Sequence, residues 1–262
     1  MMEPIYVLPQ LYKAMILSRP SKICKSPYLA DVNIYDVDGN KIEENVMAHS
    51  PALGCCGLIT TNSFVYCTKS NSVRNKSKYI IHHVLQDDHS IIGVNPMIAN
   101  PIVKSLLLNN KIDEFQNITN LQSEVTIDES RFDFSFQNDQ NLKVYLEVKN
   151  VPLTLQNDLS SNTKTAIFPD GYRKNKNEPI SIRALKHVNH LTSIHIKDTT
   201  TICVLLFLIQ RNDVVSFQPS PVDKIYQQAI YDAYSSGVKI LPICVEWKGN
   251  ECFFLKKIDF VI

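Results

Sequence analysis

Short runs of alternating apolar and polar residues fill the first third of the chain, and turn-forming residues separate them. Asp31–Val37 alternates as a strand does and is followed by the Asp38-Gly39 turn. Leu58–Thr60 and Phe64–Tyr66 have the same character. Short strands at this spacing are typical of a small β barrel or sandwich. We therefore predict a β domain over residues 1–83.

After residue 83 the pattern mixes strand and helix periods. Eight apolar residues, Ile202–Ile209, predict a fully buried strand. Further strands are predicted at Ser123–Ile127, Phe132–Phe136, Leu142–Val151 and Val238–Val245. Helices are predicted at Pro101–Leu108, with Asn100 as the cap, and at Pro179–His195. A third helix is predicted to start at a cap signature formed by Ser220-Pro221 and Asp223 and to end at Ser236. This alternation of strands and helices predicts parallel strands with crossover helices, in an α/β domain over residues 84–262.

Composition excludes several classes of protein. With 27 Lys and Arg against 26 Asp and Glu, the net charge of +1 excludes a uniformly basic protein that coats nucleic acid. The longest apolar run has eight residues, too few for a membrane helix, and we see no secretory signal. Seven cysteines without a C-x-x-C pair argue against a disulfide framework or a zinc site. We therefore expect a cytoplasmic protein, or a nuclear one in a eukaryote.

The near-zero net charge is a cancellation between segments of opposite sign. Lys13–Lys25 and Lys69–Lys78 each hold four basic residues and no acidic one. Lys111–Asp139 holds two basic and seven acidic residues, a net charge of −5, and it includes Asp133. Basic surfaces beside a carboxylate site are therefore compatible with the composition.

Two carboxylates are predicted to face each other across a hairpin. Phe132, Phe134 and Phe136 would share one strand face and leave Asp133 on the other. If the hairpin turns around Gln140, Asp133 lies directly opposite Glu147, with Cβ atoms about 5 Å apart.

Carboxylates that close repel each other unless a cation lies between them, and Mg²⁺, or Mn²⁺ in its place, has the required preference for oxygen ligands. Lys149 would project from the same face as Glu147 and could orient a water or stabilise a phosphate. This D…E-x-K arrangement is that of the metal-dependent PD-(D/E)xK nucleases. The same residues also fit an ordinary strand with solvated charges on its outer face.

Basic residues on the predicted 179–195 helix lie opposite its apolar stripe and could bind phosphates, although a merely solvated face has the same pattern. His190 belongs to this helix face as well. Nucleic-acid contacts are predicted at Arg74, Lys76, Lys78, Arg131, Arg183, Lys186 and His187.

Motifs in one fixed order extend from about Tyr28 to Val245. They include GVNPMIAN at 93–100, SRFDF at 130–134, LEVKNVPL at 146–153, FPD at 168–170 and Lys186-His187. In these motifs the chain resembles the sugar fermentation stimulation protein A family. The resemblance implies an OB-fold barrel followed by a PD-(D/E)xK nuclease-like domain. It also implies DNA binding, a link to sugar-utilisation genes in bacteria, and active-site positions at Asp133, Glu147 and Lys149.

The chain departs from the family pattern at several positions. Ser50 and Ala52 replace a Cys and an Asn in an N-terminal loop, and His82 or His83 stands where the family carries a Glu. Adjacent strand residues face opposite ways, so we expect a structural role for the two histidines rather than metal binding.

These observations predict a DNA-binding protein. One hypothesis adds Mg²⁺-assisted hydrolysis of phosphodiesters, with Asp133 and Glu147 as metal ligands and Lys149 positioning the water. The alternative is a regulator that uses the nuclease fold for recognition only. A third hypothesis is a barrel that binds a small molecule or a protein.

Overall fold

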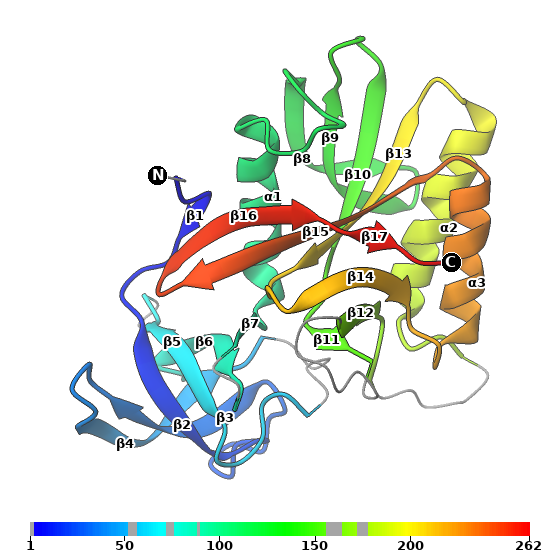
Figure 1. The fold of residues 1–262 in the computed structure, drawn as a ribbon. Helices are drawn as coiled ribbons and strands as arrows, with labels where there is room; N and C mark the ends of the chain where they lie inside the picture. The colour runs from blue at the N-terminus through cyan, green and yellow to red at the C-terminus, as the bar shows by residue number, and fades with distance from the viewer. Residues whose placement is uncertain (1–2, 52–56, 72–75, 88–89, 156–163, 172–177) are drawn as a thin grey trace.

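The computed structural model describes residues 3–51, 57–71, 76–87, 90–155, 164–171 and 178–262 (Figure 1). The predicted nucleic-acid contact at Arg74 and the family departure at Ala52 lie outside these residues. Residues 157–163, for which the sequence predicts a loop, also lie outside them.

The N-terminal part folds into a β barrel. Among the described residues, strands pair in the order β4-β3-β2-β5-β6-β7, and an additional β4–β6 pairing closes β2 to β6 into a five-stranded barrel. Ala14, Val32 and Val65 are fully buried inside it. The predicted barrel is confirmed, although Leu58–Thr60 forms a turn rather than a strand. The strands are β2 (Tyr12–Ser18), β3 (Leu29–Tyr35), β4 (Lys41–His49), β5 (Phe64–Lys69), β6 (Tyr79–Leu85) and β7 (Ile91–Gly93).

A mixed sheet forms the centre of the rest of the molecule. Within the described chain its strand order is β1-β16-β15-β13-β10-β9-β8, with β10, β13 and β15 parallel. These strands are β1 (Tyr6–Val7), β8 (Thr119–Ile127), β9 (Ser130–Gln137), β10 (Lys143–Asn150), β13 (Ile202–Ile209), β15 (Lys239–Lys248) and β16 (Glu251–Lys257). The predicted parallel pairs and the mixed α and β class are confirmed.

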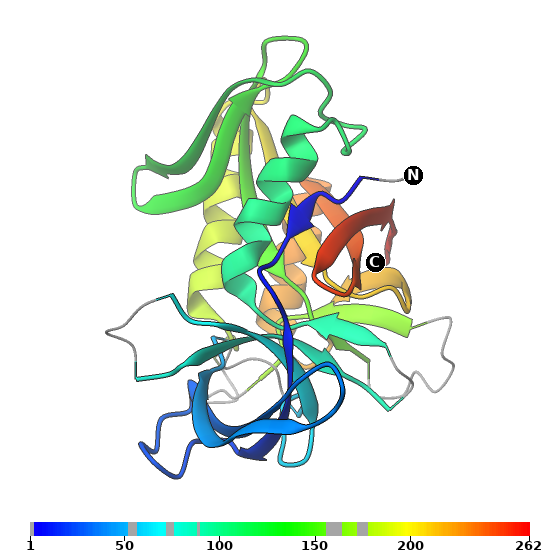
Figure 2. The same cartoon turned by 90° about the vertical axis from the view of Figure 1, so that its left-hand side faces the viewer.

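Helices cover both faces of this sheet (Figure 2). The helix α1 (Ala99–Leu108), which follows a 3-10 turn η1 (Pro96–Ile98), packs on the face that carries Val144 and Leu206. The helices α2 (Ile182–Lys197) and α3 (Lys224–Ser235) pack on the face that carries Leu205 and Phe207. A second, small sheet orders β11 (Leu153–Thr154), β12 (Lys164–Phe168), β14 (Val214–Pro219) and β17 (Asp259–Phe260). No helix in the described ranges is long and apolar enough to cross a membrane.

Two helix starts differ from the prediction. Asn100 is not a cap but lies inside α1. The capping asparagine is Asn95, five residues earlier, which accepts the Met97 N–H at the start of the preceding 3-10 turn. The helix α2 begins after Ser181, whose hydroxyl accepts the Ala184 N–H, and not at Pro179. Asp223 caps α3 as predicted.

Gln210 links the barrel to the α/β part. Its side chain is fully buried, donates to Asn150 Oδ1 at 2.7 Å and accepts from Trp247 Nε1 at 3.1 Å. Its carbonyl accepts the Gly93 N–H from the barrel strand β7 at 2.8 Å. The predicted division at residues 83 and 84 stays a prediction, although the barrel sheet continues through β7 and the N-terminal strand β1 pairs with β16.

Two adjacent histidines of β6 also lie at this junction. His82 contacts Thr68 Oγ1 at 3.0 Å and Asn95 Nδ2 at 3.1 Å, and the His83 ring lies 4.3 Å from that of Trp247. Burial lowers the pKa of His82 to about 4, and burial together with His82 lowers that of His83 to about 3. Both side chains are therefore neutral parts of the packing, as expected for structural residues.

Gly93 has no room for a side chain. A Cβ at this position would lie 2.4 to 2.7 Å from three atoms of the Gln210 side chain. We expect Gly93→Ala to lower the free energy of unfolding by about 1–3 kcal/mol, because the Gln210 hydrogen bonds must rearrange. Urea unfolding measures this change. Gly93→Ala/Gln210→Ala should cost less than the sum of the two single changes, and simple additivity would contradict the direct clash.

The buried histidines predict acid sensitivity. Each of the two histidines has a folded pKa below its unfolded value near 6.5. The stability that its neutral form contributes is therefore complete above pH 6.5 and is lost as the pH falls toward the folded pKa. Between pH 7 and pH 4.5, each histidine should lower the free energy of unfolding by about 2–3 kcal/mol. His83→Phe, which keeps a ring against Trp247, should therefore reduce the acid-induced loss by about 2 kcal/mol in urea unfolding. An unchanged pH dependence would contradict a neutral, buried His83.

Candidate functional site

The predicted hairpin register is the one observed between β9 and β10. Gln137 pairs with Lys143, Ser135 with Tyr145, and Phe134 with Leu146, so Gln140 is the midpoint. Regular pairing ends at Phe134 and Leu146. At the next position the Asp133 carboxylate takes the place of a backbone acceptor, because its Oδ2 accepts the Val148 N–H at 2.7 Å.

Asp133 faces α1 and is held from that side as well. Asn100 of α1 donates its side-chain N–H to Asp133 Oδ1 at 2.7 Å. The regular alternation of β9 is broken here, so two predictions are wrong. Phe132 does not share a face with Phe134 and Phe136, and Asp133 does not share one with Glu147. Phe134 packs with α1, whereas Phe132 packs on the opposite side beside the ring of His187.

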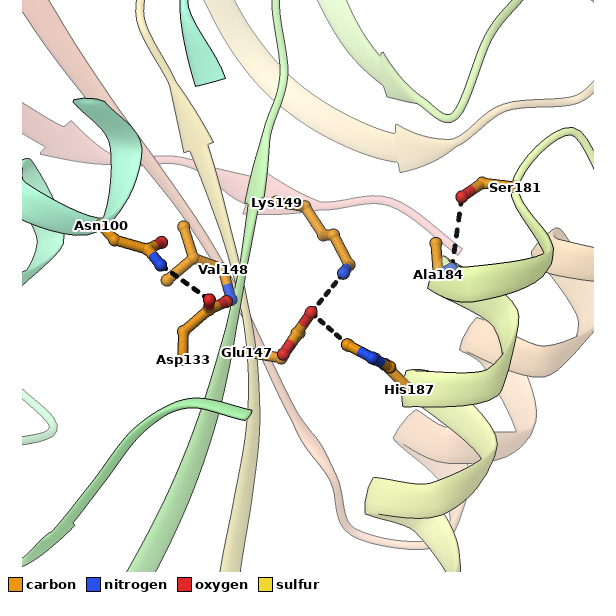
Figure 3. Close-up of polar contacts among 8 residues, drawn as sticks. All are labelled: Asn100, Asp133, Glu147, Val148, Lys149, Ser181, Ala184 and His187. Carbon is orange, nitrogen blue, oxygen red and sulfur yellow. Dashed lines mark hydrogen bonds and ion pairs between the residues drawn. The ribbon is translucent and has the colours of Figure 1, made fainter. Parts of the chain in front are cut away.

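Glu147 lies at the centre of a buried charged cluster (Figure 3). Its Oε1 atom accepts from Lys149 Nζ at 2.5 Å and contacts His187 Nδ1 from α2. Its side chain is only 5% exposed and that of Lys149 12%. The second oxygen, Oε2, is buried without a hydrogen-bond partner among the described residues. One Glu147 oxygen is thus held in place, and the other keeps its lone pairs free.

The two carboxyl groups have opposite pKa shifts. Burial and the nearby Glu147 charge raise the pKa of Asp133, although the Val148 and Asn100 donors oppose that shift. Burial by itself would raise the pKa of Glu147, but the contacts with His187 and Lys149 outweigh it and hold the pKa below its ordinary value. Glu147 is therefore ionised at neutral pH in spite of its burial.

Tyr226 of α3 adds another buried polar group that the sequence analysis missed. Burial and the negative charges of Glu147 and Asp223 raise its pKa well above the ordinary value. Its hydroxyl is buried without a hydrogen-bond partner in the described chain. An apolar helix pattern explains a tyrosine at this position equally well, so the sequence carries no separate signal for it.

The spacing E-x-K occurs twice in this chain, and only one copy is buried. Glu246 and Lys248 of β15 also form an ion pair, with Lys248 Nζ 2.7 Å from Glu246 Oε1, but the Lys248 side chain is 60% exposed. The spacing alone therefore does not identify the site. The neighbouring carboxylate of Asp133 and the covering helix α2 distinguish Glu147 and Lys149 from the exposed copy.

The predicted nucleic-acid residues lie in different surroundings. His187 is not on the solvent face of α2, as its spacing suggested, but on the buried face against Glu147. Three others contact surface carboxylates: Lys78 with Glu43, Arg131 with Glu124, and Lys186 with Glu129. Lys76 and Arg183 are exposed.

The predicted metal ligands are two in number. No group of three or more His, Cys, Asp and Glu side chains suited to a metal ion occurs in the part of the chain that the structure describes. Mg²⁺ needs no more than one or two protein carboxylates, because water and substrate phosphates complete its coordination. Glu147 Oε2, which has no partner among the described residues, fits one ligand position of such an ion, whereas each Asp133 oxygen already accepts one hydrogen bond.

Comparison with known proteins shows the family of this chain. A family model described as "Sugar fermentation stimulation protein RE domain" matches residues 97–251. The sugar fermentation stimulation protein homolog of Pelagibacter ubique is 31% identical over 95% of this chain and 97% of that protein. The chain belongs to the sugar fermentation stimulation protein family. The corresponding homolog of Clostridium kluyveri is 28% identical over 84% of this chain and 88% of its own length.

A solved structure of this family has the same fold. The chain superimposes on Pyrococcus furiosus SfsA, solved in complex with Ca²⁺, with a TM-score of 0.80 over 99% of this chain and 100% of that one. Their sequences are 15% identical. In this fold Asp133, Glu147 and Lys149 occupy neighbouring positions on β9 and β10, whereas Asn100, His187 and Tyr226 reach the site from the helices.

The buried ion pair should be much more important than its exposed copy. Lys149→Met leaves the Glu147 charge buried beside His187 without its cation, so we expect the free energy of unfolding to fall by about 3–5 kcal/mol. Lys248→Met, in the exposed E-x-K pair, is the matched control and should cost less than about 1 kcal/mol. Equal losses in urea unfolding would show that burial does not distinguish the two pairs.

Proposed function

We propose that this member of the sugar fermentation stimulation protein family binds DNA and hydrolyses its phosphodiester bonds with the help of a divalent metal ion. Asp133 and Glu147 would hold the ion, and Lys149 would bind the water or phosphate beside it. Mg²⁺ is the proposed ion, with Mn²⁺ as a substitute.

The buried, ionised Glu147 with one free oxygen is the observation that carries this proposal. Keeping a carboxylate charged inside a protein is costly, and a purely structural ion pair would satisfy both oxygens. Here the donors converge on Oε1, and Oε2 has no partner among the described residues. A bound Mg²⁺ would supply positive charge for a scissile phosphate and a water molecule of lowered pKa.

The surrounding residues have separate parts in this proposal. Asn100 and the Val148 N–H fix the direction of the Asp133 carboxylate, and His187 does so for Glu147. Lys149 carries the ammonium that could donate to a phosphate oxygen. The relative solved with Ca²⁺ supports the choice of ion class, because Ca²⁺ and Mg²⁺ both prefer oxygen ligands.

Contacts to the DNA backbone are proposed at the basic residues predicted from sequence. Lys76 and Arg183 are exposed, and the ion pairs of Lys78, Arg131 and Lys186 lie at the surface, where a phosphate can replace the carboxylate at small cost. Arg74 keeps this role as a proposal from sequence. His187 is the exception, since its buried contact with Glu147 favours a positioning role.

A second candidate function is DNA recognition without cleavage. Two observations favour it: Lys149 Nζ is engaged by Glu147, and the described residues offer two carboxylates rather than a larger ligand cluster. Under this reading the protein binds DNA equally well with and without a divalent ion.

Conservative changes at the two carboxylates separate these functions. We expect Glu147→Gln and Asp133→Asn to weaken Mn²⁺ binding, measured by calorimetry, and to reduce Mg²⁺-dependent DNA cleavage by at least about 100-fold. Asp139→Asn, at the exposed tip of the same hairpin, and Glu246→Gln, in the exposed E-x-K pair, are matched controls that should leave both unchanged. Wild-type protein that binds Mn²⁺ but cleaves neither single- nor double-stranded DNA would favour recognition only. Absence of Mn²⁺ binding would refute the metal site.

A further inference from the structure

A row of large side chains crosses the outer face of the barrel. Lys13 of β2 pairs with Tyr35 on β3 and with Tyr66 on β5, so these three side chains lie in line across three neighbouring strands. The next residues along the strands, Ala14 and Val65, are fully buried in the barrel core. Because side chains alternate along a strand, the row of Tyr35, Lys13 and Tyr66 points away from the core.

Further aromatic and basic side chains adjoin this row. The Lys13 ammonium lies 4.4 Å from the centre of the Phe64 ring, and Phe64 is 38% exposed. The Lys69 ammonium lies 5.1 Å from the centre of the Tyr12 ring. Phe64 therefore extends the outer row, whereas Tyr12 lies on the core side with Ala14 and packs against Tyr79.

The row lines a groove. Leu11, Tyr12, Lys13, Tyr35 and Tyr66 are among the residues around a hollow of about 310 Å³. A second hollow shares Leu11 and Tyr66 and ends at Asn250, in the turn between β15 and β16. In Figure 1 this turn lies next to β5 and above β2. The groove therefore runs from the barrel face toward the α/β part of the molecule.

Asp36 is the acidic residue that lines the first hollow, and its charge is directed into its own turn. Its carboxylate accepts the backbone N–H groups of Asp38 and Asn40 and the side-chain N–H of Asn40. Lys13 is the basic residue that lines this hollow, and it therefore sets the sign of the charge offered to a ligand. A groove with aromatic faces and positive charge is suited to an anion that carries flat rings.

We propose that this groove binds unpaired nucleobases of a single-stranded nucleic acid, with Tyr35 and Tyr66 stacking on bases and Lys13 between them contacting a phosphate. One strand, β2, lies between the strands of the two tyrosines, so they are two strand spacings or about 10 Å apart, which leaves space for Lys13 to meet the backbone between two bases. A duplex hides the faces of its bases, so it offers the tyrosines nothing to stack on. The inference rests on the proposed function, because it names the unpaired strand as the form of substrate that is bound.

The test is the affinity for a fluorescent dT12 oligonucleotide, for rU12 and for a 12-base-pair duplex, measured by anisotropy in EDTA so that cleavage cannot occur. Tyr35→Leu and Tyr66→Leu should each weaken dT12 binding about tenfold, whereas Tyr35→Phe and Tyr66→Phe keep the ring and should stay within about twofold of wild type. Tyr234→Leu, an exposed tyrosine of α3, is the control outside the groove. Lys13→Gln should reduce the slope of log affinity for dT12 against log salt concentration by the amount expected for about one phosphate contact.

Several outcomes decide the question. Weaker dT12 binding by the Leu variants, with the Phe variants and duplex binding unaffected, supports the inference, and the dT12-to-rU12 ratio identifies the preferred sugar. Equal binding by the Leu and Phe variants, or tighter wild-type binding to duplex than to dT12, overturns it. If a Leu variant unfolds, photocross-linking of a bromodeoxyuridine oligonucleotide to wild-type protein takes its place as the test. Cross-links that form elsewhere than at the two tyrosines also overturn the inference. Mn²⁺ binding at Glu147 is measured without nucleic acid, so failure of the groove and failure of the metal site are distinguishable.

Discussion

The hydrogen bond from the Val148 N–H to the Asp133 carboxylate determines how the centre of this molecule is built. It replaces a backbone pairing between β9 and β10, so the two strands stop their regular ladder at Phe134 and Leu146. From this point Asp133 faces α1, and Glu147 faces α2 on the other side of the sheet. One side chain thus ends the strand pairing, and its carboxylate stays close enough to Glu147 for the Glu147 charge to raise the pKa of Asp133.

Burying two carboxylates is costly, and the fold compensates by bringing donors from several elements. The helix α1 supplies Asn100, α2 supplies His187 and β10 itself supplies Lys149. The opposite pKa shifts of the two carboxyl groups follow from this arrangement, because the donors at Asp133 are neutral whereas Glu147 has an ammonium beside it. Such a division between two neighbouring acids is typical of sites that bind charge or move protons.

Much of this arrangement could be predicted from the sequence because it depends on local periods. The two-residue period of β9 and β10 and the single turn between them determined the register, and the apolar run of β13 identified the central strand. Contacts between elements distant in sequence could not be read in this way. Asn100 looked like a helix cap and His187 like a surface residue, since the direction of each depends on how its helix packs against the sheet.

The two E-x-K pairs show why the same sequence motif can have different chemical properties at two places in one chain. Both pairs lie on central strands, but only the pair on β10 is covered by α2, which excludes water and adds His187. Low exposure strengthens each electrostatic interaction there, whereas water and salt weaken the pair on β15. The chemistry of the motif is therefore a property of its surroundings, and the helix that follows β12 contributes as much to it as the strand that carries the motif.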